Sequence, residues 1–272
     1  MVSIVSGNEL GLLTNPTTPR NNPDTGRSGQ SDSVYVNSAT GNLVIQARDE
    51  YVAATGLDLG LVRTYNAQGE FTDDNGDNWR LGVHQRLYGL VGTVNTEGSR
   101  ITKEFGDGAR ILYTFDATQG LYRSPEGEGA HDTLSFDTTS QTWTWTEGSS
   151  RLTETYNSSG QLSSSRDRDG NTISYVYTGN LLTQITDASG QVTYLDYTGN
   201  NLTQIRVVSQ GQTQTLTRYS YDAQNRLSQV SVDLSPEDNA ISDGRTYTTT
   251  YTYDGTSTRI ASITHSDGTR VS

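Results

Sequence analysis

The 272-residue sequence contains no cysteine. Disulfide bonds and thiolate metal sites are therefore excluded. Transmembrane helices are not expected either, because the sequence has no run of 18 apolar residues. Histidine is scarce, with only three in the chain. A histidine-based metal or nucleophile site would need His84, His131 and His265 to converge from distant segments, and we interpret all three as solvent-facing or strand-packing residues.

Positive charge is also in short supply. Nineteen lysines and arginines stand against 31 aspartates and glutamates, which gives a net charge of −12. This balance argues against binding to a nucleic-acid backbone or to anionic lipid, both of which favour clustered basic residues. The first residues, MVSIVSGNELGLL, lack basic residues and a sustained apolar stretch. We therefore expect no cleavable signal peptide within this chain.

The residues that are abundant favour strands. Hydrophobic residues make up only 31% of the chain, but 16 tyrosines and three tryptophans supply bulky side chains for a core, and 28 glycines indicate frequent turns. Tyrosine and threonine are typical of strands. From residue 31 onward, apolar and polar residues alternate with a period of two, and turn residues recur every 8 to 12 positions. The sequence predicts a nearly all-β fold and no cofactor.

A duplicated unit is written into the second half of the chain. YTGNLLTQI at 177–185 is repeated as YTGNNLTQI at 197–205, an offset of 20. Related units follow at 218–230 and 250–268. A repeat at this period is typical of stacked architectures in which no unit buries its apolar face alone. We expect each unit to form a strand, a turn built from Gly, Asn or Asp, and a second strand anchored by Leu or Ile.

Paired tyrosines mark the first strand of these units. Each pair is separated by one residue and so lies on one sheet face: Tyr175 and Tyr177, Tyr219 and Tyr221, and Tyr251 and Tyr253. Cross-strand aromatic contacts stabilise neighbouring strands without any ligand. We therefore interpret these six tyrosines as structural repeat residues.

Three segments follow from composition and pattern. Residues 1–30 contain three of the five prolines and no periodicity, and we expect an extended leader or linker. The pattern of residues 31–150 predicts an N-terminal β region that precedes the repeats, with two strands around a turn at 37–42. The next strand alternates strictly and places one set of side chains on a single face: Leu57, Leu59, Leu61, Arg63 and Tyr65. Residues 151–272 hold the repeats.

Two groups of residues carry candidate binding chemistry. Asp73, Asn75 and Asp77 have the alternating oxygen spacing of a calcium loop, but Asn78 stands where such a loop has glycine, so a polar turn is the favoured interpretation. Trp143 and Trp145 share one face of a strand. If exposed, the two rings would form a platform for stacking sugars; if buried, they are core residues, which is the favoured interpretation.

YDAQNRL, together with the recurring G-x-L, D-x-x-G and Y-x-Y elements, resembles the YD repeats of bacterial Rhs proteins, with relatives in Tc toxin shells and teneurins. The segment ATGNLVIQARDEYVAATGLDLGLVRTYNAQG is similar to the region that precedes Rhs repeats, where a TG-x-L strand leads to an L-x-L-x-R-T-Y-N strand. The resemblance covers roughly residues 34–272. DDNGDNW departs from the family's pattern, because no glycine directly precedes Trp79.

The resemblance implies a long antiparallel sheet of short hairpins and YD repeats that spirals into part of a shell or barrel-like wall. It implies a non-catalytic structural segment that encloses or displays a downstream toxin or effector. The partners would be the remainder of the same shell and that effector, at a secreted or cell-surface location. The alternative is a surface adhesin module that binds carbohydrate through exposed Trp and Tyr, and an enzyme ranks third.

The end of the chain resembles an interrupted repeat. DGTRVS at 267–272 aligns with DGNTIS at 169–174, where Tyr175 and Tyr177 follow. The aromatic part of the strand is thus not reached before residue 272. We expect this chain to be a piece of a longer protein, truncated within the repeats.

Overall fold

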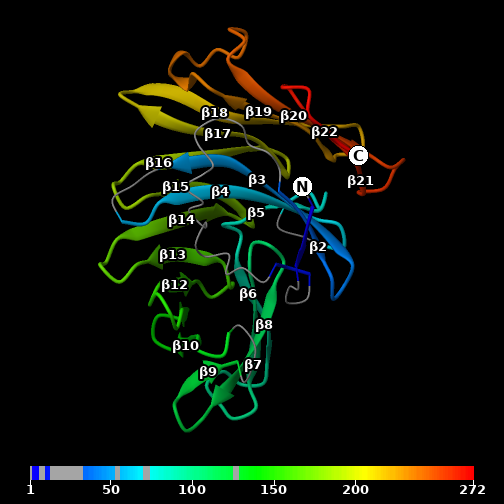
Figure 1. The fold of residues 1–272 in the computed structure, drawn as a ribbon. Coiled ribbons are helices and arrows are strands. Elements are labelled where there is room, and N and C mark those ends of the chain that lie inside the picture. Colours follow the sequence, from blue (N-terminus) through cyan, green and yellow to red (C-terminus); the bar gives the residue numbers. More distant parts are fainter. Residues whose placement is uncertain (1, 6–9, 13–32, 53–55, 70–73, 125–128) are drawn as a thin grey trace.

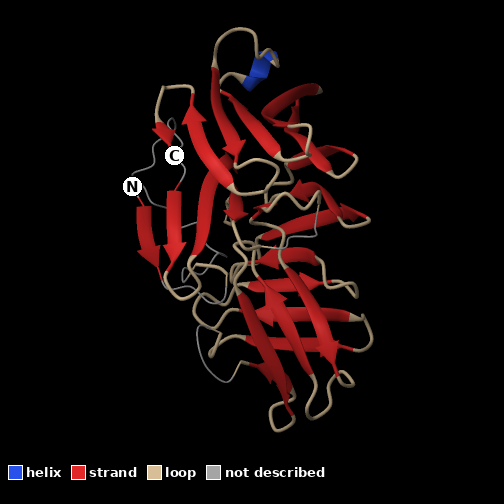
Figure 2. Cartoon of the chain, turned by 90° about the vertical axis from the view of Figure 1, so that its right-hand side faces the viewer, coloured by secondary structure: helices blue, strands red, loops and turns tan. Residues whose placement is uncertain are grey.

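The computed structural model describes residues 2–5, 10–12, 33–52, 56–69, 74–124 and 129–272. Within these residues the protein is almost entirely β-structure (Figure 2), and the one helix is a short 3-10 turn, η1, at Pro236–Asp238. The predicted all-β fold is confirmed. Among the same residues, no helix is both long and apolar enough to cross a membrane.

The first sheet has five strands. They are β1 (Val2–Val5), β2 (Ser33–Asn37), β3 (Asn42–Val52), β4 (Leu59–Asn66) and β5 (Trp79–Leu81), hydrogen-bonded in that order. β1 runs parallel to β2, and the other pairs are antiparallel. The hairpin predicted at 37–42 is present, and Gly41 takes the left-handed backbone conformation (φ +70°) that such a turn requires.

The second sheet contains seventeen strands in chain order, each antiparallel to the next. They are β6 (Arg86–Val91), β7 (Arg100–Glu104), β8 (Arg110–Asp116), β9 (Leu121–Arg123), β10 (Thr133–Asp137), β11 (Thr142–Thr146), β12 (Thr153–Tyr156), β13 (Leu162–Arg166), β14 (Thr172–Thr178), β15 (Leu181–Thr186), β16 (Val192–Thr198), β17 (Asn201–Ser209), β18 (Gln212–Tyr221), β19 (Leu227–Asp233), β20 (Thr246–Tyr253), β21 (Ile260–His265) and β22 (Arg270–Val271). Figure 1 shows this sheet passing through the whole molecule, from β7–β9 at one end to β18–β22 at the other.

The long sheet curls but is not closed into a barrel. Its first strand, β6, lies beside the start of β13, where Arg86 forms an isolated bridge with Gln161. Beside it, the Leu87 N–H donates to the carbonyl of Gly160 at 2.9 Å. These contacts fold β6–β13 around an interior of their own.

The turns between repeat strands are set by an aspartate. The Asp187 carboxylate accepts hydrogen bonds from the N–H groups of Ser189 and Gln191 at 2.9 Å each. Gly190, between these two residues, has a φ of +88°. Asp167 and Asp222 accept equivalent bonds from residues two and four positions later. A side chain that satisfies these N–H groups ends one strand and starts the next, which explains the recurring D-x-x-G and D-x-x-N signature.

A bulge recurs in the Y-x-Y strands. The register shifts immediately before the second tyrosine of four repeats, at Tyr177, Tyr197, Tyr221 and Tyr253. A bulge adds twist and bends a strand. Repetition of the bulge at the same point in successive hairpins gives the sheet its consistent curvature.

Two apolar cores result. The first lies between the five-stranded sheet and the concave face of β14–β21, and its largest members include Tyr65, Trp79, Tyr219 and Tyr251. The second lies inside β6–β13 and contains Tyr113, Tyr122 and both strand tryptophans of β11. The predicted alternation along β4 is confirmed, because Leu59, Leu61 and Tyr65 all enter the first core. This core draws on both 31–150 and 151–272, so the three-segment division stays a prediction about the sequence.

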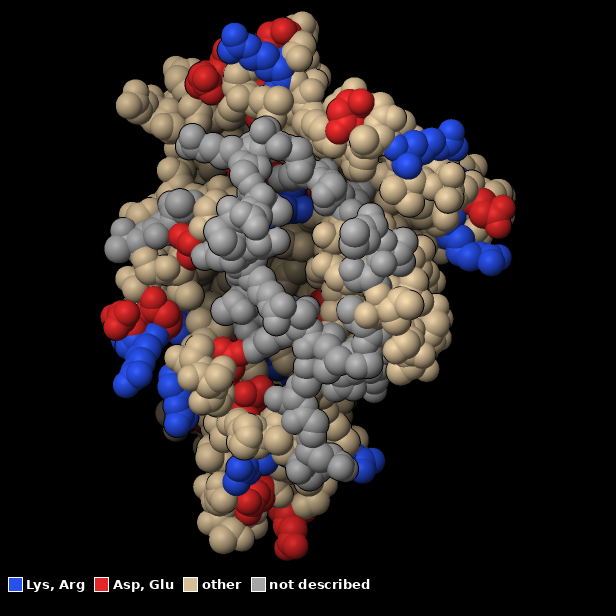
Figure 3. Space-filling model, viewed as in Figure 1, with Lys and Arg blue, Asp and Glu red and all other residues tan. Residues whose placement is uncertain are grey.

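Charged side chains of both signs lie interspersed around the rim of the face seen in Figure 3. Acidic groups there stand beside arginines rather than in one large patch of a single sign. Mixed charge of this kind is typical of a solvent-exposed surface.

Candidate functional site

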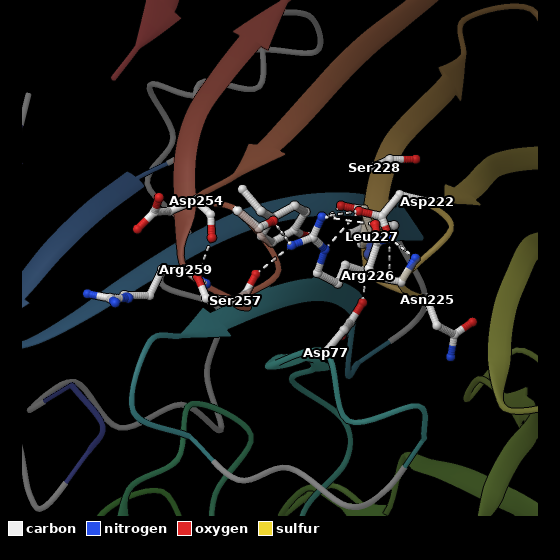
Figure 4. A network of polar contacts seen from close by, with 12 residues as sticks. Asp77, Asp222, Asn225, Arg226, Leu227, Ser228, Asp254, Ser257 and Arg259 are labelled. Carbon is white, nitrogen blue, oxygen red and sulfur yellow. Dashed lines mark hydrogen bonds and ion pairs between the residues drawn. The ribbon is translucent and has the colours of Figure 1, made fainter.

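The turn before β5 joins the two sheets. The Asp77 carboxylate accepts from the N–H of Trp79 at 3.0 Å and, across the interface, from the N–H of Leu227 at 2.9 Å. The Asn75 amide donates to the Asn201 side chain at 2.8 Å and to the Asn225 carbonyl at 3.2 Å. Figure 4 shows Asp77 directed at the first residue of β19. We call these polar contacts of Asn75 and Asp77 with the repeats the seam.

Beside Leu227, a second group of polar contacts links one repeat to the next, and we include it in the seam. Arg226 pairs with Asp222, with Nε to Oδ2 at 2.8 Å, and its Nη1 donates to the carbonyls of Gly255 and Ser257 at 2.8 and 2.6 Å. The guanidinium also lies 4.5 Å from the ring centre of Tyr253. Burial raises the pKa of Asp222, but the hydrogen bonds from Arg226 outweigh it and hold the pKa below its usual range. The R in the repeat's Y-D-x-x-x-R element therefore fastens neighbouring turns together (Figure 4).

Beneath the seam, an arginine is enclosed by aromatic rings in the first core. Arg63 pairs with Asp49 at 3.2 Å, and both side chains are buried. Its guanidinium lies 4.5 Å from the Trp79 ring centre and donates to the hydroxyl of Tyr251 at 3.0 Å. The Tyr219 hydroxyl donates to Asp49 at 2.6 Å. Burial raises the pKa of Asp49 despite the neighbouring guanidinium.

The second core contains a buried lysine. Lys103 is fully buried, pairs with Glu154, and has its ammonium 3.4 Å from the Trp145 ring centre. The hydroxyl of Tyr156 donates to the same glutamate at 2.5 Å. Burial lowers the pKa of Lys103, and the charge of Glu154 opposes that shift. Among 272 residues this is the only lysine, since the other 18 basic residues are arginine.

A third buried carboxylate is surrounded by arginines. Glu104 accepts from Arg86 at 2.6 Å and from Arg110 at 2.9 Å, and it lies 3.1 Å from Arg80 of the five-stranded sheet. Burial raises the pKa of Glu104, but the three guanidinium groups outweigh it and keep the pKa below the usual range. This ion cluster ties β5 to β7 and β8.

The tyrosines of the repeats face the first core. Tyr219 and Tyr251 are buried, and Tyr175, Tyr177, Tyr221 and Tyr253 pack half-buried against the same cluster. Their hydroxyl groups connect adjacent strands. Tyr221 donates to the carbonyl of Leu202 at 3.0 Å, and Tyr253 donates to the carbonyl of Leu227 at 2.6 Å. The second tyrosine of a repeat thus binds the anchor residue of the repeat before it.

We expect the contribution of such a hydroxyl to be separable from that of its ring. Tyr253→Phe removes the hydrogen bond to the Leu227 carbonyl and the one accepted from the Trp79 indole N–H at 3.2 Å. It should lower the free energy of unfolding by about 2 kcal/mol. Tyr253→Ala also removes the ring and should cost about 3 kcal/mol or more. Thr250→Ala, on the exposed face of the same strand, is the matched control and should stay within about 0.5 kcal/mol of wild type. Urea denaturation measures all three, and equal stabilities for the alanine and wild-type proteins would contradict a packing role.

The tryptophans predicted as a candidate sugar platform are buried. Trp143 is 5% exposed and Trp145 is 0% exposed. Trp145 donates from Nε1 to the Tyr113 hydroxyl at 2.9 Å, and Trp143 packs edge-on to Tyr122. The hypothesis of an exposed platform is wrong for these two rings, because β11 turns them into the interior of β6–β13 where other aromatic side chains cover them.

The candidate calcium loop is engaged in the seam. Asn75 and Asp77 make the hydrogen bonds described above, and Asp73 lies outside the described residues. Within the described part of the chain, no group of three His, Asp or Glu side chains is placed to hold a metal ion. The histidines lie on separate elements: His265 is buried beside Thr249, His84 packs edge-on to Tyr177, and His131 is exposed.

Three carboxyl groups near the sheet interface have raised pKa values. Burial raises the pKa of Asp77 and Asp107 to about 6 and that of Glu50 to about 7. Because each folded-state pKa lies above the ordinary value, the stability that protonation confers is present at low pH and is lost as pH rises through about 6 to 7. Glu104 and Asp222 act in the opposite direction, and only below about pH 4.

We therefore expect the free energy of unfolding to increase when the pH falls from 7.5 to 5. Asp77→Asn should flatten part of this dependence, whereas Asp222→Asn, whose carboxyl is ionised throughout that window, should leave the slope unchanged. Guanidinium denaturation at several pH values measures both slopes. A wild-type stability that falls between pH 7.5 and 5 would contradict the prediction.

Fold and seam together define an all-β repeat protein whose turns and tyrosines bind successive hairpins to one another. Over residues 156–192, the chain matches the family model "RHS Repeat". The predicted resemblance to Rhs/YD-repeat proteins is confirmed. Those residues run from the end of β12 to the start of β16 and include the first of the duplicated units.

Solved structures with some similarity include two crystal structures and a pore assembly. A TcdB2-TccC3-Cdc42 structure has 17% identity and a TM-score of 0.35 over 86% of this chain and 15% of that chain. TcdB2-TccC3 without its hypervariable C-terminal region has 18% identity and a TM-score of 0.35 over 84% and 14%. The Tc holotoxin pore of Photorhabdus luminescens has 16% identity and a TM-score of 0.28 over 86% and 15%. At these TM-scores the likenesses support no argument about function.

The chain spans about 15% of the length of the solved chains it matches. No curated protein matches the sequence significantly.

Sequence reasoning missed the buried ions. Arg63 was placed on the core face of its strand by alternation, which was the one available signal for its burial. Lys103 also alternates with apolar neighbours along β7, so it carried the same signal. Neither pattern reveals the acidic partner, because Asp49 and Glu154 come from other strands.

Proposed function

We propose that this chain is a non-catalytic wall segment of an Rhs-type shell, which encloses or displays a downstream toxin or effector. The observation that carries the proposal is the match of residues 156–192 to the RHS repeat within one continuous, curved sheet of seventeen strands. In this sheet the turn aspartates, the bulges and the tyrosine hydroxyl groups all serve to join hairpins. A sheet built this way extends as a surface.

The ionisable groups of the interior support a structural role. Three of the most buried carboxylates are each held by a cation: Asp49 by Arg63, Glu154 by Lys103, and Glu104 by Arg80. Catalytic pairs are instead expected in a cleft, with one group poised to exchange protons. Consistent with a wall, the partners in this proposal are the remainder of the same shell and the effector, at a secreted or cell-surface location.

Protease protection of the native gene product tests the proposal. An effector enclosed by the shell should resist digestion as long as the wall is folded, and should be cut at the rate of an unprotected domain once the wall opens. Asp77→Ala removes the acceptor of two seam N–H groups and should accelerate cleavage. Thr250→Ala, on the exposed face of β20, is the control. A gene product without an effector region, or one whose effector is digested equally fast in wild type and Asp77→Ala, contradicts the proposal.

A further inference from the structure

Residues 10–12 are held by their main chain in a polar cradle. The carbonyl of Leu10 accepts from the amide groups of Asn42 at 2.8 Å and Asn66 at 2.9 Å. The carbonyl of Gly11 accepts from the Asn37 amide at 3.0 Å, and the N–H of Leu12 donates to Asp107 at 2.8 Å. We call Asn37, Asn42, Asn66 and Asp107, with Ala109, the cradle.

Contacts outside the bound segment orient the asparagines of the cradle. The Asn37 Oδ1 accepts from the N–H of Ala39 at 2.9 Å, and the Asn42 Oδ1 accepts from the N–H of Gln68 at 3.0 Å. The Asn66 Oδ1 accepts from the Asn42 amide at 2.7 Å. With their oxygens committed in this way, the three side chains present NH₂ groups to the segment, and an NH₂ group recognises a carbonyl whatever side chain it carries.

Two features select the sequence of the bound segment. A Cβ added to Gly11 would lie 2.5 Å from both the Cβ and the backbone nitrogen of Ala109, so only glycine fits at this position. The following residue, Leu12, is 2% exposed and fills an apolar position. The cradle therefore fits a bent main chain in which glycine is followed by a large apolar residue.

The polar groups of the cradle are fully withdrawn from solvent. All three asparagines are 0% exposed and Asp107 is 2% exposed. These exposures hold with Leu10–Leu12 in place, and departure of the segment would break all four hydrogen bonds to its main chain. Another main chain with the same carbonyl and N–H groups would restore them. The members of the cradle come from both sheets, because the asparagines lie at the ends of β2, β3 and β4 whereas Asp107 and Ala109 lie between β7 and β8.

We propose that the cradle is a peptide-binding site for a Gly-Leu main chain, filled in cis by Leu10–Leu12, and that this occupant is a latch between the five-stranded sheet and the β7–β8 turn. The site accepts the same peptide in trans once the cis segment is displaced. In wild type the tethered segment excludes a competitor, because tethering gives it an effective concentration on the order of millimolar.

The test uses the full chain with Gly11→Val, which expels the cis segment by steric clash. A fluorescent synthetic peptide of residues 8–14 should bind this variant saturably and bind wild type at least about tenfold more weakly. The same peptide with valine in place of glycine should bind the variant at least about tenfold more weakly as well, a difference of about 1.4 kcal/mol. A folded variant that binds both peptides equally, or neither, overturns the proposal.

Amide hydrogen exchange in wild type decides the matter independently of how well Gly11→Val folds. The Leu12 N–H should exchange at least about tenfold more slowly than an unprotected amide, and Asp107→Ala should abolish that protection. An unprotected Leu12 amide in wild type overturns the proposal.

Discussion

Replacing Lys103 with methionine is expected to lower the free energy of unfolding by about 3–5 kcal/mol. The methionine retains most of the volume against Trp145, but Glu154 is left buried with only the hydroxyl of Tyr156 to compensate its charge. The cost of an uncompensated buried charge exceeds the net contribution of the intact pair. Chemical denaturation followed by tryptophan fluorescence, to which Trp143 and Trp145 of the second core contribute, measures the effect.

The double variant Lys103→Met/Glu154→Gln separates the pair from the packing. Glutamine keeps an acceptor for the Tyr156 hydroxyl without a charge, and removal of both charges should restore at least half of the lost stability. A single variant as stable as wild type would show that Glu154 needs no cation. A double variant no more stable than the single one would show that packing of the lysine stem carries the effect.

Arg63→Met is expected to cost a similar amount, about 3–5 kcal/mol, because it strands Asp49 in the first core. The loss should be smaller at pH 5 than at pH 8. Burial already raises the pKa of Asp49, and without the guanidinium the carboxyl takes up a proton more readily, so the variant regains stability as the pH falls. Denaturation at the two pH values provides the measurement.

Arg48→Met is the matched control for Arg63→Met. Arg48 lies on the neighbouring strand β3, is half-buried, and stands over the Tyr51 ring at 5.8 Å. Its loss should cost less than about 1 kcal/mol at either pH. Equal losses for the two arginine variants would mean that the aromatic enclosure adds nothing to Arg63.

The regular part of the fold could be predicted because its causes are local. The period-two pattern of β4, the turn at Gly41 and the D-x-x-G signature each act within a few residues. The bulge before each second tyrosine was not predictable from alternation. The apolar–polar pattern of the sequence continues through the point at which the strand pairing shifts by one residue.

The relation between the two sheets could not be predicted for a different physical reason. Asp77 and Leu227 are 150 positions apart, and their hydrogen bond depends on how far the long sheet curves before it meets β5. The same curvature decides which way β11 turns. Trp143 and Trp145 were correctly placed on one face, but whether that face was covered depended on β6 returning to meet β13.

The composition of the molecule has a practical consequence for following its unfolding. The only ε-amine in the chain belongs to Lys103, and that amine lies against Trp145 inside β6–β13. Acylating and cross-linking reagents directed at lysine therefore meet no side-chain target on the folded surface. The fraction of molecules that such a reagent modifies at Lys103 therefore reports how often the second core opens. No label has to be introduced in advance.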